Sequence, residues 1–185
     1  MFLTVFAGAT LLTIGVGHLF DTLTHLLGDL ETVSATTTQH YTSATVVDDD
    51  NKPTGKTVNP DAPDQIAFTG LLKSGAISST IFRAGLPSSK GRKQFLWEID
   101  GEDGSIRLES DEIGSSFINV QNPNLYLNGE LVDIPQVSGP SDNITSAWEA
   151  FAQGEGYATL EDAVRIHQIL DAVTKSAQEG KVVHL

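Results

Sequence analysis

Residues 11–28 read LLTIGVGHLFDTLTHLLG, and the interpretation of the whole chain depends on this stretch. Its apolar side chains recur at helical spacing, and Gly28 is a typical residue for a helix C-terminus. His18, Asp21 and His25 are spaced i, i+3 and i+7, which places them on one face of a helix. We therefore predict a helix that packs through its leucines and phenylalanine and carries a single polar stripe.

The polar stripe has three possible chemical roles. It could transfer protons, because the unperturbed pKa of a histidine side chain, about 6.5, lies near physiological pH. It could bind a metal ion, although His18, Asp21 and His25 would need a further converging ligand. It could also be a structural network in which His18 pairs with Asp21 or with a backbone carbonyl. The spacing alone leaves all three open.

Length and composition restrict the class of protein. The chain has 185 residues, which suits one domain over residues 1–185. Its net charge of −13 disfavours direct binding of nucleic acid, and the absence of cysteine excludes disulfides and thiolate sites. Residues 1–7 are an atypical leader without the basic residues of a signal peptide, and no apolar run is long enough for a membrane span. We expect a cytoplasmic protein.

The rest of the chain predicts an α+β fold, with a large, mostly antiparallel sheet and helices packed on one face. Residues 43–63 are rich in aspartate, proline and glycine and are predicted to be a flexible loop. The strands are predicted at residues 32–42, 65–72, 76–84, 94–100, 105–110, 124–127 and 130–134. A helix ending at residue 153 is expected to bury Ile144, Trp148 and Phe151, and another, from 159 to 180, to bury Val164, Leu170, Val173 and Ala177.

Two further motifs are weak. Gly15-Val16-Gly17 imitates the start of a dinucleotide fingerprint, but Phe20 occupies the place of the third glycine. We therefore predict no cofactor-binding residues. Arg83 and the basic loop after it, with Lys90, Arg92 and Lys93, could bind an anion, although such a loop is more often simply solvated.

A series of short motifs occurs in order along the chain. They are Gly17-His18-x-x-Asp21, Val33-Ser34-Ala35-Thr36, Asp64-Gln65-Ile66, Ser74-Gly75-Ala76, Phe82-Arg83-Ala84-Gly85, Trp97-Glu98-Ile99-Asp100-Gly101, Gly104-Ser105-Ile106 and Tyr157-Ala158-Thr159-Leu160-Glu161-Asp162-Ala163. Together these motifs resemble the C-terminal domain of the Gfo/Idh/MocA oxidoreductases, the glucose–fructose oxidoreductase and inositol dehydrogenase family. The resemblance covers nearly the whole chain from about Gly8, is of the fungal type, and extends to a subgroup that represses transcription in the galactose pathway.

The resemblance implies a function for the polar stripe. It implies a sheet that holds substrate on its helix-covered face and self-associates through its open face. His18 would be the catalytic residue, beside the sugar or polyol hydroxyl that loses a proton, with Asp21, His25 and Arg83 binding substrate. NAD or NADP would serve a full-length parent, since the cofactor fingerprint and catalytic lysine of the family's Rossmann domain have no counterpart in this sequence. We expect no cofactor on this chain alone, and no metal.

One departure from the family pattern favours an alternative. Where dehydrogenase members often carry an acidic residue four positions before the histidine, this sequence has Ile14. The alternative is a non-catalytic regulator that binds a protein partner, in the cytoplasm or in the nucleus. The sequence thus predicts either the substrate and oligomerisation domain of a sugar or polyol oxidoreductase, or a regulatory relative of one.

Overall fold

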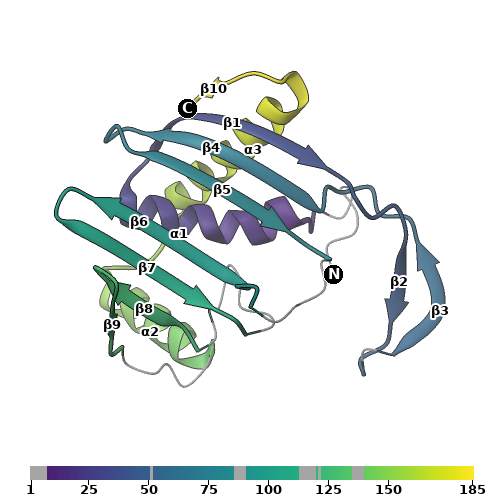
Figure 1. Cartoon of the computed structure of the whole chain (residues 1–185), viewed down its shortest axis with the longest axis horizontal. Helices are drawn as coiled ribbons and strands as arrows, with labels where there is room; N and C mark the ends of the chain where they lie inside the picture. The colour runs from purple at the N-terminus through teal and green to yellow at the C-terminus, as the bar shows by residue number, and fades with distance from the viewer. Residues whose placement is uncertain (1–7, 51, 86–90, 113–119, 121, 135–139) are drawn as a thin grey trace. The chain divides into compact units, whose positions relative to one another are not determined.

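The computed structural model describes the chain except for residues 1–7, 51, 86–90, 113–119, 121 and 135–139 and the side chains of residues 140–143 (Figure 1). The chain divides into two compact units, Met1–Leu86 with Glu161–Leu185, and Pro87–Leu160. The single-domain organisation stays a prediction. Within the described residues, no helix is long and apolar enough to cross a membrane.

The first unit is built on a four-stranded antiparallel sheet, in the order β10-β1-β4-β5. Its strands are β1 (Leu30–Thr38), β4 (Gln65–Leu72), β5 (Ile77–Arg83) and β10 (Val183–His184). The predicted strands of this region are therefore confirmed, with the first one ending four residues earlier than expected. A β-bulge between Leu30 and Thr32 shifts the register of β1 on β4.

One face of this sheet is covered by two helices (Figure 1). Helix α1 (Gly17–Leu27) continues from a π-helical turn, η1 (Leu11–Val16), and α3 (Leu160–Glu179) follows the second unit. Phe20 of α1 packs on Phe68 of β4, with ring centroids 4.7 Å apart. Helix α3 buries Ile166, Ile169, Leu170 and Val173 in the same core, whereas Val164 is exposed, against expectation. The prediction for Val164 was wrong because the side of α3 that faces the core carries Ile166 and Ile169 instead.

Residues 43–63, predicted to be a flexible loop, contain a hairpin formed by β2 (Ala44–Val47) and β3 (Pro53–Val58). Valines and threonines supply the strand-forming side chains. The aspartates form its turn, because the Asp48 carboxylate accepts hydrogen bonds from the backbone N–H groups of Asp50 (3.0 Å) and Lys52 (2.9 Å). The prediction of an unstructured loop was therefore wrong for this part of the segment.

The second unit contains another four-stranded antiparallel sheet, ordered β6-β7-β8-β9, and the helix α2 (Pro140–Gln153). Its strands are β6 (Phe95–Gly101), β7 (Gly104–Ser110), β8 (Asn124–Leu127) and β9 (Glu130–Val132). Asn128 and Gly129 turn between β8 and β9 with φ of 52° and 83°, as their sequence predicts. The expected burial of α2 was wrong, because Ile144, Trp148 and Phe151 are all exposed.

Together these elements confirm the predicted α+β fold with antiparallel sheets. The hydrogen bonds between the described strands group them into two four-stranded sheets and the β2–β3 hairpin, where the sequence predicted one large sheet.

Candidate functional site

Helix α1 is fixed at both ends by the sequence around it. Thr10 caps the turn η1, where its hydroxyl accepts from the N–H of Thr13 (3.1 Å) and its N–H donates to the Thr13 hydroxyl (2.9 Å). Gly28 ends the helix with a φ of 90°, a conformation that favours glycine. The predicted helix and its C-terminal glycine are confirmed, but nothing in the sequence indicated that the first turn is a π-helix.

The polar stripe faces away from the core. Phe20 and Leu23 are buried against the sheet, whereas His18, Asp21 and His25 are all exposed. The three side chains share one face of α1, as their spacing predicts. The stripe is therefore exposed on a helix whose opposite face packs into the core.

Arg83 does not join this stripe. It pairs with Gln65 at the end of β5 and lies on the same side of the strand as Ile81, opposite Phe82, which packs against the core. The sheet therefore separates Arg83 from α1. We call the side of the sheet that carries Arg83 the open face; its other exposed members are Ser34, Thr36, Thr38, Thr69, Ile77, Ser79 and Ile81.

The glycine pair of the apparent dinucleotide fingerprint does not fit a cofactor's pyrophosphate. Gly15 and Gly17 are buried inside the continuous helix formed by η1 and α1, not in a turn between a strand and a helix. Phe20, in place of the third glycine, is fully buried against Phe68. Among the residues described by the structure, no group of three His, Cys, Asp or Glu side chains is arranged to hold a metal ion.

The basic loop is partly neutralised by neighbouring carboxylates. Lys93 Nζ lies 3.0 Å from Glu109 Oε1 and 3.1 Å from Asp111 Oδ1. Hydrogen bonds to these two carboxylates raise the pKa of the Lys93 ammonium. Lys90 lies outside the described residues. Lys93 therefore serves contacts within the second unit, which leaves less positive charge for an anionic ligand than the sequence suggested.

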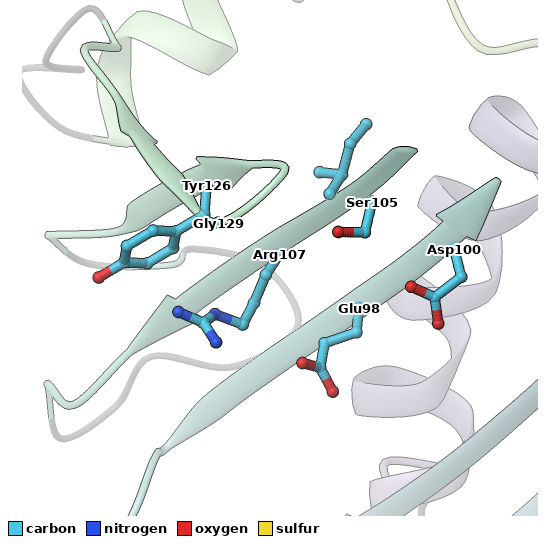
Figure 2. Close-up of a pocket in the computed structure, with 7 residues that line it drawn as sticks. Glu98, Asp100, Ser105, Arg107, Tyr126 and Gly129 are labelled. Atoms are coloured by element: carbon cyan, nitrogen blue, oxygen red, sulfur yellow. The ribbon is translucent and has the colours of Figure 1, made fainter. Parts of the chain in front are cut away.

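Sequence reasoning missed a polar pocket in the second unit. It opens on one face of the β6–β7–β8 sheet and is lined by Glu98, Asp100, Ser105, Arg107 and Tyr126 among others (Figure 2). The Arg107 guanidinium stacks on the Tyr126 ring, 4.3 Å from its centroid, and its Nε lies 3.3 Å from Glu109 Oε2. Strand alternation places these residues on one face, but only the register between the strands brings Glu98 opposite Arg107 and Arg107 opposite Tyr126.

Comparison with known proteins agrees with the resemblance seen in the sequence. The chain is 28% identical over 181 residues to the dehydrogenase aclE of Aspergillus oryzae, covering 94% of this chain and 48% of that protein. It is 27% identical over 125 residues to the galactose/lactose metabolism regulatory protein GAL80 of Kluyveromyces lactis, covering 66% of this chain and 27% of that protein. The chain thus spans about half or less of the length of these relatives.

Solved structures of both functional kinds share the fold. The structure of the transcriptional regulator Gal80p from Kluyveromyces lactis superposes with a TM-score of 0.80 at 25% identity, over 96% of this chain and 46% of that one. A levoglucosan dehydrogenase, solved in complex with NADH and L-sorbose, has a TM-score of 0.64 at 20% identity, over 95% of this chain and 50% of that one.

The family model described as "Gal80p, C-terminal domain" matches residues 1–110, which is more than half of the chain. With its α+β fold of antiparallel sheets, the chain belongs to the Gal80p C-terminal domain family, whose structural neighbours include sugar oxidoreductases.

Proposed function

We propose that this chain is the substrate-binding and oligomerisation part of an NAD(P)-dependent oxidoreductase that acts on a sugar or polyol hydroxyl. The observation that carries the proposal is the outward-facing stripe of His18, Asp21 and His25 on a helix whose opposite face is packed into the core. A dehydrogenase relative and the sugar dehydrogenase fold support it. The activity belongs to a complete protein about twice this length.

The stripe provides the groups that a polyol needs. An imidazole can accept the proton of a reacting hydroxyl, so we assign that role to His18. The Asp21 carboxylate and the His25 imidazole can hydrogen-bond to neighbouring hydroxyls and so orient the substrate. Arg83 lies on the open face, so it is not beside these three residues. NAD or NADP would supply the hydride chemistry in a full-length parent, but Gly15 and Gly17 of this chain do not fit its pyrophosphate.

Binding of polyols to the 185-residue chain tests this proposal. Titration with L-sorbose or glycerol, followed by NMR of the histidine ring signals, should shift the signals of His18 and His25. His18→Gln and Asp21→Asn should each weaken binding at least about tenfold, the equivalent of about 1.4 kcal/mol. His167→Gln, which replaces an exposed histidine on α3, is the matched control and should bind as the parent chain does. Equal binding by the stripe variants would rule out the assignment.

A second function is a regulator without catalysis. In many dehydrogenases of the family that the sequence resembles, we expect an acidic residue four positions before the histidine. In this chain that residue is Ile14, which is half-buried in η1. The Gal80p family match and the higher TM-score with Gal80p also favour this reading. In a full-length parent that is a regulator, His18→Ala should leave binding of a protein partner intact. Loss of dehydrogenase activity in the same variant would favour the enzyme. We place the enzyme in the cytoplasm, and a regulator there or in the nucleus.

We also propose that the chain self-associates through the open face of the first unit. Ile77 and Ile81 are 80% and 71% exposed beside the hydroxyl row of Ser34, Thr69 and Ser79. Burying two such side chains in an interface is favourable. Sedimentation equilibrium should show a dimer or larger species for the parent chain and a monomer for Ile81→Glu. A monomeric parent chain at high concentration would contradict self-association.

A further inference from the structure

Helix α2 of the second unit has an exposed apolar face. Ile144, Trp148 and Phe151 follow the i, i+4, i+7 spacing of one helix face, and they are 59%, 67% and 58% exposed. Large side chains at this exposure in a cluster mark an interaction surface more often than single exposed residues do. We call these three residues, with Tyr157, the aromatic face of α2.

The aromatic face is ordered by contacts among its own rings. Trp148 and Phe151 meet edge to face with centroids 5.9 Å apart, and Phe151 meets Tyr157 in the same way at 5.3 Å. These contacts hold the rings in place before any partner arrives, so less side-chain entropy is lost on binding. Tryptophan and tyrosine are also the residues that most often dominate binding energy at protein interfaces.

The sequence on both sides of this face is acidic, which indicates the chemistry of the partner. Between Arg107 and Arg165 the sequence contains ten carboxylates and no lysine, arginine or histidine. Two of these carboxylates are close in sequence to the aromatic face. Glu149 follows Trp148, and Glu155 lies between Phe151 and Tyr157; both are exposed. Such a surface repels an acidic segment and attracts a basic one.

We propose that the aromatic face of α2 docks a basic amphipathic helix of a protein partner. The partner's apolar side chains would cover Trp148 and Phe151, and its lysines or arginines would meet Glu149 and Glu155. The polar stripe lies on α1, which belongs to the other unit, so the two proposals rest on different residues. Failure here would leave the proposed substrate site unaffected.

A designed peptide tests the surface directly on the 185-residue chain. The probe is a fluorescein-labelled peptide of leucine and lysine with helical amphipathic spacing, titrated by fluorescence anisotropy. The comparison peptide carries glutamate in place of every lysine. We expect the lysine peptide to bind and the glutamate peptide to bind at least about tenfold more weakly. Raising the salt from about 50 mM to about 500 mM should weaken the lysine peptide several-fold, because the charges lie at the surface.

Variants locate the binding. Trp148→Ala and Phe151→Ala should each weaken the lysine peptide at least about tenfold. Leu96→Ala, which truncates another exposed apolar residue of the second unit, is the matched control and should bind as the parent chain does. Glu149→Gln with Glu155→Gln leaves the aromatic rings in place and should reduce the salt dependence. Far-ultraviolet circular dichroism checks that each variant is folded.

Three results would overturn the proposal. The first is equal binding of the lysine and glutamate peptides, which would leave only nonspecific apolar contact. The second is unchanged binding by Trp148→Ala and Phe151→Ala. The third comes from sedimentation: if Trp148→Ala converts a self-associated parent chain into a monomer, a second copy of the chain occupies this face instead.

Discussion

The hydroxyl of Ser176 on α3 connects β1 to the segment between α3 and β10 in the first unit. The hydroxyl oxygen accepts a hydrogen bond from the backbone N–H of Ala35 on β1 (2.9 Å), and the hydroxyl O–H donates to the carbonyl oxygen of Lys181 (2.6 Å). Strand β10 pairs with β1 only at Thr32 and Val33, so the serine satisfies an N–H that lies beyond the reach of that strand. Ser176 is fully buried, so both of its hydrogen bonds are shielded from bulk water.

Replacing Ser176 with alanine should therefore destabilise the first unit. The substitution leaves the Ala35 N–H buried without a partner, which costs about 1–3 kcal/mol in the free energy of unfolding. Urea denaturation followed by circular dichroism measures this change. Ser34→Ala, one residue before Ala35 but on the open face, is the control and should change stability by less than about 0.5 kcal/mol. Equal effects of the two variants would show that the serine bridge contributes little.

Asp64 should make stability depend on pH at acidic values. Its carboxylate accepts from the N–H of His40 (2.9 Å) and of Tyr41 (2.7 Å). Partial burial acts to raise the pKa of Asp64, but the hydrogen bonds from His40 and Tyr41 outweigh it, and the folded pKa lies below the ordinary 3.8. A lowered folded pKa means that this stabilisation is present above about pH 4 and is lost as the pH falls through the folded value.

Asp64→Asn removes the charge from these hydrogen bonds. At neutral pH it should cost about 1 kcal/mol, below the range of about 1.5–3 kcal/mol for hydrogen bonds to charged groups, because the carboxyl is partly exposed. The loss of stability of the parent chain below about pH 4 should become shallower in the variant. Thermal denaturation over a series of pH values measures both effects. Asp171→Asn, on an exposed position of α3, should retain the parent's pH dependence.

Gly70 is required by close packing in the centre of β4. A Cβ added there would lie 2.5 Å from Leu30 Cδ2 and 3.1 Å from the Thr32 carbonyl oxygen. Leu30 is buried, so it cannot move away without disturbing the core. Gly70→Ala should cost about 1–3 kcal/mol from overpacking, whereas Thr69→Ala, on the open face, should be nearly neutral. Chemical denaturation of both variants separates a packing effect from a general weakening of the strand.

The sequence predicted the features that depend on local chemistry. Gly28, Asn128 and Gly129 have the positive φ values that mark a helix end and a hairpin turn, and both elements end where they were expected to. The aspartates at residues 48–50 have the composition of a loop and yet form the turn of a hairpin, because one carboxylate can cap two backbone N–H groups. Composition alone does not distinguish these two cases.

The errors over α2 and Arg83 concern contacts between elements. Helical spacing identified one apolar face on α2, but nothing in that spacing indicates whether another element covers it, and Trp148 is exposed. Arg83 was grouped with His18 because both belong to one family resemblance. Strand alternation already places Arg83 and Phe82 on opposite faces of β5. That the sheet separates Arg83 from His18 follows only from the position of α1, which lies on the Phe82 side.

The exposure of the polar stripe provides a test against a purely structural role. If Asp21 and His25 held the helix in place, their removal would destabilise the fold. Both are exposed on α1, so Asp21→Ala and His25→Ala should each change the free energy of unfolding by less than about 0.5 kcal/mol. Phe20→Ala, on the opposite face of the same helix, should cost about 3–5 kcal/mol, because it empties a fully buried site against Phe68.

Urea denaturation of the three variants measures the free energy of unfolding and separates the two roles of the stripe. A loss above about 1 kcal/mol in Asp21→Ala or His25→Ala would favour the structural network, whereas unchanged stability combined with weakened polyol binding would leave ligand recognition as the role of the stripe.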